Sequence, residues 1–174
     1  MSPPHVYLRY AELVRAYSDK LDLVSPGDLD RFEERHIRDS LRARRWVQRC
    51  PPGPAVDVGS GAGLPGIPLA IADPRRRWCL LEPRQRRAAF LEEVVRDLEL
   101  TNVEVRAQTA EQAAAELGAV HSVAVARALA PPAAALEILR PLVVPGGTVL
   151  LFVGGEEPAL KYAEVEPGLV KVEV

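Results

Sequence analysis

The chain carries Val56-Asp57-Val58-Gly59-Ser60-Gly61-Ala62-Gly63-Leu64-Pro65-Gly66, a short apolar run followed at once by a glycine-rich turn. The run follows a Pro-Pro-Gly-Pro break, and its β-branched residues are typical of a buried parallel strand. Because the glycines have no Cβ, a ligand can lie against backbone N–H groups at the start of a helix expected over residues 64–72. The turn therefore predicts the binding site of a nucleotide-like cofactor.

The spacing of the glycines distinguishes between classes of cofactor. A dinucleotide fingerprint needs a third glycine three residues after Gly61, and Leu64 stands there instead. Asp57 lies two residues before Gly59, at the end of the strand, where its carboxylate can pair with a cationic group of the ligand. S-adenosylmethionine carries an amino group and a sulfonium, so the turn suits this methyl donor better than a pyrophosphate. A tight turn without a ligand is the alternative interpretation.

Glu82 is the second candidate for cofactor binding. Residues 77–81 are typical of the next strand, and Glu82 follows them directly. In doubly wound folds, an acid roughly 20 residues after the glycine turn binds the ribose hydroxyls. A carboxylate accepts hydrogen bonds from both hydroxyls. A solvated acid in a loop is the alternative, and the position after a buried strand favours binding.

Length and composition are those of a globular protein. At 174 residues the chain is long enough for one domain with a buried core. No apolar run is long enough to span a membrane, and the first ten residues lack the apolar core of a signal peptide, so we expect a cytoplasmic protein without a membrane segment. Two cysteines and three histidines at unrelated spacings supply neither a disulfide framework nor a metal site.

The charge of the chain indicates at most local binding of polyanions. A net charge of −2 is unlike that of dedicated nucleic-acid-binding proteins, which are usually basic. Arginines nevertheless gather in three clusters, within residues 42–45, 75–77 and 84–87. Guanidinium groups bind phosphates bidentately, so these clusters permit a polyanionic substrate. A solvated helix face is the simpler explanation of any one cluster.

Strands and helices alternate along most of the chain. Helices are expected over residues 5–20 and 29–47, before the break at Pro51. Further on, we expect strands at 55–59, 77–81, 103–106, 122–126 and 147–153, and helices at 64–72, 84–98, 110–117 and 131–142. This alternation predicts an α/β fold, with helices on both faces of a mostly parallel sheet and the ligand crevice at the carboxyl ends of the strands. Residues 168–174 leave room for one more strand but not for a closing antiparallel pair.

These residues together resemble the glucose-inhibited division protein B family, bacterial enzymes that methylate N7 of a guanine in small-subunit (16S) ribosomal RNA. The likeness covers roughly residues 10–174, and its most specific parts are residues 35–41 (Arg-His-Ile-Arg-Asp-Ser-Leu) and 57–70. The Leu81-Glu82 strand end, residues 86–91 and Ala126-Arg127-Ala128 also match. The sequence Leu-Pro-Gly-Ile-Pro-Leu-Ala at residues 64–70 is typical of this family and of few others.

The resemblance implies the architecture of a Rossmann-like class I methyltransferase that depends on S-adenosylmethionine. Residues 1–50 would form an N-terminal helical segment, and residues 51–174 the methyltransferase domain. S-adenosylmethionine would contact Gly59, Leu64, Ala110 and Glu111, with Arg127 lining the pocket. The full set of predicted cofactor-binding residues adds the turn and strand-end residues Asp57, Gly61 and Glu82. The implied partner is small-subunit ribosomal RNA or the ribosomal subunit, and we expect a monomer.

The chain departs from the family pattern at several positions. Relatives usually carry Lys-Gly where this chain has Gly154-Gly155, and a serine where it has Ala126. They also usually carry Asn-Leu-Thr near residues 22–24, where this chain reads Asp-Leu-Val. The final pair of strands in relatives is expected to be absent here.

Arg127 is the predicted catalytic residue. It follows the fourth expected strand, at the switch point beside the glycine strand, where its planar donor fork can hold a guanine or a phosphate. A surface arginine at a strand end is the alternative. N7 of guanine is a free lone pair at neutral pH, so its methylation needs no general base, and alignment contributes roughly 7–11 kcal/mol. His36 and Asp39 lie three residues apart on an expected helix and can contact each other.

Two other functions stay open at this point. One is methylation of a small molecule, which would be insensitive to salt, whereas RNA binding through arginines weakens steeply as salt rises. The other is a cofactor-binding or RNA-binding module without turnover. A nicotinamide-dependent oxidoreductase is the weakest alternative, because 174 residues leave little chain for a substrate domain.

Overall fold

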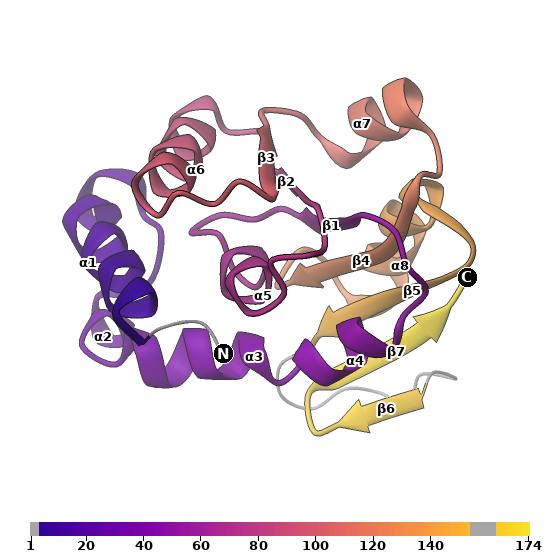
Figure 1. The fold of residues 1–174 in the computed structure, drawn as a ribbon, viewed down its shortest axis with the longest axis horizontal. Coiled ribbons are helices and arrows are strands. Elements are labelled where there is room, and N and C mark those ends of the chain that lie inside the picture. The colour runs from indigo at the N-terminus through magenta and orange to yellow at the C-terminus, as the bar shows by residue number, and fades with distance from the viewer. Residues whose placement is uncertain (1–3, 154–162) are drawn as a thin grey trace.

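The computed structural model describes residues 4–153 and 163–174 (Figure 1). Its strands are β1 (Ala55–Val58), β2 (Trp78–Leu81), β3 (Val103–Arg106), β4 (His121–Arg127), β5 (Val143–Phe152), β6 (Ala163–Glu166) and β7 (Leu169–Glu173). They form one seven-stranded sheet in the order β3-β2-β1-β4-β5-β7-β6. β1 to β5 pair in parallel, while β7 is antiparallel to both β5 and β6. The expected α/β fold with a mostly parallel sheet is confirmed.

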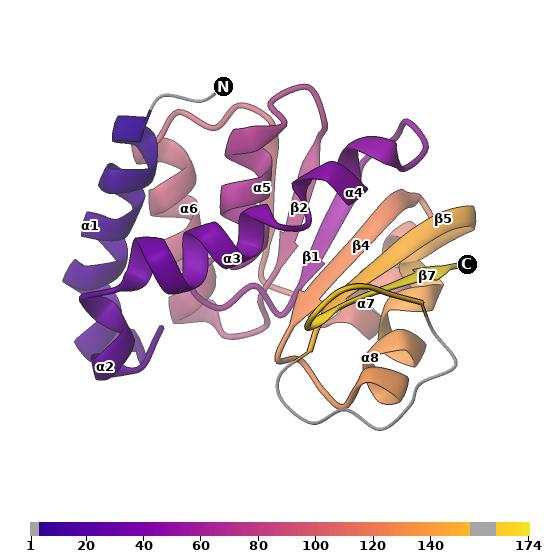
Figure 2. The same cartoon turned by 90° about the horizontal axis from the view of Figure 1, so that it is seen from below.

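Helices cover both faces of this sheet (Figure 2). The helical elements are α1 (Pro4–Leu21), α2 (Pro26–Leu29), the π-helical turn η1 (Glu33–Ile37), α3 (Arg38–Leu41), α4 (Arg44–Arg49), α5 (Gly66–Ala72), α6 (Gln85–Asp97), α7 (Ala110–Leu117), α8 (Pro132–Leu139) and the 3-10 turn η2 (Arg140–Leu142). α7, α8 and η2 pack against one face through alanine, leucine and valine side chains. The N-terminal helices, α5 and α6 cover the other face. Among the described residues, no helix is both long enough and apolar enough to cross a membrane.

The strand order places a switch point at β1. β2 and β3 lie on one side of β1, while β4 and β5 lie on its other side. The loops that leave the carboxyl ends of β1 and β4 therefore diverge, and a crevice opens between them, which is where ligands bind in open α/β sheets. The glycine turn follows β1, and Arg127 is the last residue of β4, so both lie at this point.

The C-terminal part of the sheet corrects an expectation. A closing pair of strands was expected to be absent, but β6 and β7 form an antiparallel hairpin, and β7 pairs with β5 from Thr148↔Glu173 to Phe152↔Leu169. The hairpin needs only a two-residue connection, so a short segment suffices for it. Residues 154 and 155, where relatives carry Lys-Gly, lie outside the described residues.

The expected helix over residues 29–47 is divided into three shorter elements, η1, α3 and α4. Phe32 and Ile37 are both buried, at 0% and 4% exposure, although they lie five positions apart. A regular α-helix places such residues on different faces, whereas the π-helical turn over Glu33–Ile37 inserts the extra residue that brings both onto the core side. Burial of the two apolar side chains therefore explains why the helix is irregular.

β5 is longer than expected and contains a bulge. The fifth strand was expected over residues 147–153, but β5 already begins at Val143. The register with β4 shifts from His121↔Val143 to Val123↔Thr148, so extra residues of β5 lie opposite a short stretch of β4. Gly146 has φ = +78°, a conformation that favours glycine. The strand is therefore continuous, with the glycines absorbing the irregularity.

Asn102 joins the loop after α5 to the start of β3, and it gives a test of the fold. Its Nδ2 donates to Ala70 O and to Arg76 O, both at 3.1 Å. We expect Asn102→Ala to lower the free energy of unfolding by about 1–3 kcal/mol, because two carbonyl groups lose their donor. Urea unfolding measures the change. The exposed Gln48→Ala serves as control, and equal stability of the two variants would contradict the assigned role.

Candidate functional site

The glycine turn after β1 adopts a backbone conformation that few other residues tolerate. Gly59, Gly61 and Gly63 have φ values of +72°, +56° and +96°. The N–H groups of Gly59 and Ser60 both donate to Leu81 O, at 2.9 and 3.0 Å, which ties the turn to the end of β2. The turn is thus a fixed platform at the carboxyl edge of the sheet.

Glu82 holds this platform from the neighbouring strand. The residue is 4% exposed, and its Oε2 accepts a hydrogen bond from Gly61 N at 2.9 Å. Its Oε1 accepts from Arg84 N, also at 2.9 Å. Each carboxylate oxygen has two lone pairs, so Glu82 can still accept hydrogen bonds from ligand hydroxyls.

Asp57 forms a hydrogen bond to the end of the glycine turn, where α5 begins. It is fully buried, and its Oδ2 accepts a hydrogen bond from Gly66 N, the first residue of α5, at 3.0 Å. Burial raises the pKa of this carboxyl to about 7, and Oδ1 has no hydrogen-bond partner among the described residues. The expected helix start at Leu64 is wrong for this reason: α5 begins at Gly66, and its first N–H faces Asp57. Ligand pairing by Asp57 stays a prediction.

Tyr10 is a site residue that the sequence alone did not single out. Its side chain is fully buried, and its Oη donates to Ala62 O in the glycine turn at 2.7 Å. The ring packs edge-on against Phe32, with 5.4 Å between centroids. A tyrosine on the apolar face of a helix is expected to be buried, and a buried tyrosine hydroxyl needs a hydrogen-bond partner. This requirement is the signal in the sequence that could have identified Tyr10.

A pocket of about 280 Å³ opens beside the glycine turn and Glu82. Its wall is formed by the ends of β1 and β2 with the loops that follow them, the loop after β3, the start of α7, the loop before α8 and the last turn of α8. The lining residues are Val58, Gly59, Leu81, Glu82, Pro83, Arg84, Arg87, Gln108, Thr109, Ala110, Glu111, Leu129 and Ile138. Apolar atoms of Pro83, Leu129 and Ile138 can cover a flat ring. The Glu82 carboxylate supplies acceptors for hydroxyls. This combination fits a nucleoside.

The glycines make space for such a ligand. A Cβ added at Gly59 would lie 2.9 Å from Leu129 Cδ1, so a side chain there would collide with the pocket wall. A Cβ at Gly61 would meet nothing closer than Gly59 O at 3.9 Å, and it would project into free space above the turn. The turn is therefore open where a ligand would rest on it.

The structure brings most of the predicted cofactor-binding residues to this pocket. The pocket is lined by Gly59, Glu82, Ala110 and Glu111. Gly61 does not line it, but its N–H donates a hydrogen bond to the Glu82 carboxylate. Ala110 and Glu111 open α7, whose N-terminus is closed by a capping box between Thr109 and Gln112. Leu64 is 4% exposed within an apolar cluster and does not line the pocket. Its contact with the cofactor stays a prediction.

Arg127 lies at the end of β4 and pairs with the N-terminal helices. Its Nη1 is 3.7 Å from Asp39 Oδ2, and burial lowers the pKa of its guanidinium. Asp39 also accepts from Arg42 Nη1 at 2.8 Å, while His36 faces Asp28 at 3.8 Å. Asp39 is therefore held between two arginines. The side chain of Arg127 is 20% exposed, but it is not among the residues that line the pocket beside the glycine turn, so its place in that pocket stays a prediction.

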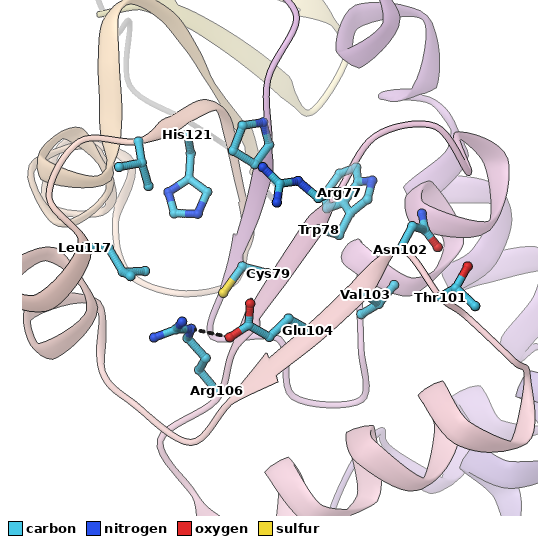
Figure 3. Close-up of a pocket in the computed structure, with 12 residues that line it drawn as sticks. Arg77, Trp78, Cys79, Thr101, Asn102, Val103, Glu104, Arg106, Leu117 and His121 are labelled. Atoms are coloured by element: carbon cyan, nitrogen blue, oxygen red, sulfur yellow. Dashed lines mark ion pairs between the residues drawn. The ribbon is translucent and has the colours of Figure 1, made fainter.

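A second pocket, of about 350 Å³, lies at the opposite, amino-terminal edge of the sheet (Figure 3). Trp78, Cys79 and His121 contribute to its wall, and Arg106 Nε pairs with Glu104 Oε1 at 2.7 Å. Burial raises the pKa of the Cys79 thiol to about 12, so this thiol is not a nucleophile at neutral pH. None of the predicted site residues borders this pocket.

Comparison with known proteins assigns the chain to a family. The family model described as "GidB: rRNA small subunit methyltransferase G" matches residues 5–166. The chain belongs to this family. It is 42% identical over 149 residues to the ribosomal RNA small subunit methyltransferase G of Frankia alni, a match that covers 84% of this chain and 56% of the relative. The corresponding protein of Acidothermus cellulolyticus is 39% identical over 150 residues, covering 84% of this chain and 64% of that relative.

The chain thus spans a little over half the length of the first of these relatives. A solved methyltransferase from Geobacter sulfurreducens superimposes with a TM-score of 0.62 at 14% identity, covering 99% of this chain and 89% of that one. At this identity the likeness concerns the fold alone. The family match confirms the resemblance to the GidB family, and the solved structure shows that the two chains share a fold.

Replacement of Glu82 tests the platform in the absence of any ligand. In Glu82→Gln, an amide NH₂ must face the N–H of either Gly61 or Arg84, so one buried hydrogen bond is lost. We expect the free energy of unfolding to fall by about 1–3 kcal/mol, measured by urea denaturation. Glu92→Gln, an exposed change on α6, is the matched control. A Glu82 variant as stable as this control would show that the carboxylate does not hold the turn.

The raised pKa of Asp57 predicts a dependence of stability on pH. The pKa of Asp57 is 3.8 ordinarily and about 7 in the folded chain. At pH values between these two, the folded chain holds the Asp57 proton more tightly than the unfolded chain does. Stability contributed by the protonated form is therefore present at low pH and lost as pH rises to about 7. We expect the unfolding free energy of the unaltered chain to fall by roughly 1–4 kcal/mol more than that of Asp57→Asn over this interval.

Thermal or urea unfolding at several pH values provides the comparison. Asp19→Asn, at an exposed position on α1, should reproduce the profile of the unaltered chain. Parallel profiles for Asp57→Asn and the unaltered chain would contradict the raised pKa.

Proposed function

We propose that this chain binds S-adenosylmethionine in the pocket beside the glycine turn and transfers its methyl group to N7 of a guanine in small-subunit (16S) ribosomal RNA. One observation supports the proposal above all: in a chain of this family, Gly59, Glu82 and the Ala110-Glu111 pair line a single pocket at the switch point of the sheet. The printed names of the relatives describe ribosomal RNA small subunit methyltransferases, and this activity is carried to the chain here as a proposal.

Each pocket residue has a separate part in holding the cofactor. Glu82, which keeps Gly61 in place, would accept hydrogen bonds from the ribose hydroxyls. Pro83, Leu129 and Ile138 would cover the adenine ring, next to the start of α7 at Ala110 and Glu111. Gly61 leaves room for the methionine part, and Leu64 contributes through the backbone of the turn. Asp57, close beneath the turn, attracts the cationic groups of the ligand.

When bound, the cofactor supplies an electrophilic methyl group on its sulfonium. The chain aligns the guanine with this methyl group and excludes water, and it needs no general base because N7 carries a free lone pair. Arg127, at the end of β4, donates hydrogen bonds to the guanine or to an adjacent phosphate. Asp39, whose Oδ2 lies 3.7 Å from Arg127 Nη1, holds this guanidinium in place. Arg127 is the catalytic residue in this proposal.

The remaining expectations concern the cellular setting. The partner is small-subunit ribosomal RNA or the ribosomal subunit, encountered in the cytoplasm by a monomer. The division into an N-terminal helical segment at residues 1–50 and a methyltransferase domain at residues 51–174 also stays a prediction.

Methyl transfer to RNA tests the proposal directly. The chain is incubated with tritiated S-adenosylmethionine and small-subunit ribosomal RNA or ribosomal subunits that lack the modification, and the nucleosides are then separated. We expect label in 7-methylguanosine. In Gly61→Asn, asparagine tolerates the positive φ but fills the space above the turn, so cofactor affinity measured by calorimetry should fall at least about a hundredfold.

Two variants separate binding from turnover. Gly146→Asn changes another glycine with positive φ and open surroundings, at the bulge in β5, and should bind the cofactor normally. Arg127→Lys should retain cofactor affinity and lose most of the methyl transfer, because lysine has no planar fork. Cofactor binding without label in any ribosomal substrate would instead favour a module without turnover. Label in a small molecule, insensitive to salt, would favour the other open function.

A further inference from the structure

An arginine-rich face runs along η1, α3 and α4. Arginines recur at residues 35, 38, 42, 45 and 49, and steps of three and four residues place side chains on one side of a helical backbone. Figure 2 shows α3 and α4 following one another across the same side of the molecule. We name these five side chains the arginine stripe. At the rise of a helix, it is about 20 Å long.

The stripe concentrates positive charge in a chain that is acidic as a whole. Residues 35–49 contain six arginines and one acid, a net charge of +5, whereas the whole chain has a net charge of −2. Arg38 and Arg49 are exposed and form no ion pair with any residue in the described parts of the chain. Their charges are therefore available to an external anion.

Two contacts hold the C-terminal part of the stripe in position. Arg45 Cζ and Arg49 Cζ lie 4.9 and 5.3 Å from the centroid of the Trp46 ring. Trp46 is itself fixed, because its Nε1 donates to Glu166 Oε1 at 3.1 Å. These cation–π contacts orient both guanidinium groups, which lowers the entropy lost when an anion binds. Arg45 Nη2 also pairs with Glu166 Oε1 at 2.8 Å, whereas Arg49 forms no ion pair among the described residues, so its N–H donors stay available to an anion.

The middle of the stripe reaches the proposed active site. Asp39 accepts from Arg42 at 2.8 Å and lies 3.7 Å from Arg127, so one carboxylate links the stripe to the arginine at the crevice. A surface hollow of about 420 Å³ lies here, lined by Glu34, Arg35, Arg38, Asp39 and Arg42. A chain of phosphates that follows the stripe therefore passes directly beside Arg127.

We propose that the arginine stripe binds the phosphodiester backbone of the RNA whose guanine is presented at Arg127. The inference rests on the proposed function for the identity of the RNA, and on the position and charge of the stripe for the binding surface. Evenly spaced guanidinium groups on an extended face match a row of phosphates, and they bind it without reading its bases.

Removal of two unpaired charges tests the stripe. Arg38→Gln/Arg49→Gln is compared with Arg96→Gln/Arg140→Gln, which removes the same charge from exposed positions on α6 and η2, outside the stripe. Affinity for transcribed small-subunit ribosomal RNA is measured at several salt concentrations. We expect the stripe variant to bind at least about tenfold more weakly, with the salt slope reduced by about 2, and the control to bind within about twofold of the unaltered chain.

Cofactor affinity of the same proteins, measured with S-adenosylhomocysteine, separates this inference from the proposed function. Loss of RNA affinity in the stripe variant with unchanged cofactor affinity supports the stripe. RNA binding by the stripe variant equal to that of the unaltered chain, or equal losses in both double variants, overturns it. Absence of salt-sensitive RNA binding by the unaltered chain also overturns it. Failure of every protein to bind the cofactor would instead count against the proposed function, whatever the RNA results.

Discussion

Two buried carboxylates at the ends of neighbouring parallel strands fix the glycine turn, and the rest of the site depends on this arrangement. Glu82 accepts from Gly61 N at the end of β2, and Asp57 accepts from Gly66 N at the end of β1. A turn of three glycines with positive φ has much conformational freedom to lose, and these hydrogen bonds hold it in one state. The pocket is therefore formed before any ligand arrives, which lowers the entropic cost of binding.

The N-terminal helices complete the site from the other side of the turn. Tyr10 on α1 donates to Ala62 O, and Asp39 on α3 pairs with Arg127 after β4. Arg42 continues the connection, because it contacts both Asp39 and Glu166 in the C-terminal hairpin. Segments far apart in the sequence thus meet around the crevice, and the orientation of Arg127 depends on a helix more than eighty residues before it.

Much of the fold was predictable from the sequence because its signals are local. The apolar run before the glycines, the strand before Glu82 and the alternation after Pro51 define the parallel sheet and the edge where the pocket lies. The errors concern features set by distant contacts. The π-helical turn exists because Phe32 and Ile37 are buried in the same core. The bulge at Gly146 depends on the register between β5 and β4. The hairpin of β6 and β7 is joined to the sheet by the pairing of β7 with β5. The partners of Tyr10 and Asp57 likewise become visible only in three dimensions.

We propose that the fixed glycine turn and Glu82 form the cofactor site, and a crystal structure of the chain with S-adenosylhomocysteine is the decisive test. We expect density in the pocket between Gly59, Glu82 and Ala110, with the ribose hydroxyls within hydrogen-bond distance of the Glu82 carboxylate and the Gly61–Glu82 contact unchanged. Density in the pocket at the amino-terminal edge beside Trp78 and His121, or a ligand whose ribose lies away from Glu82, would contradict it.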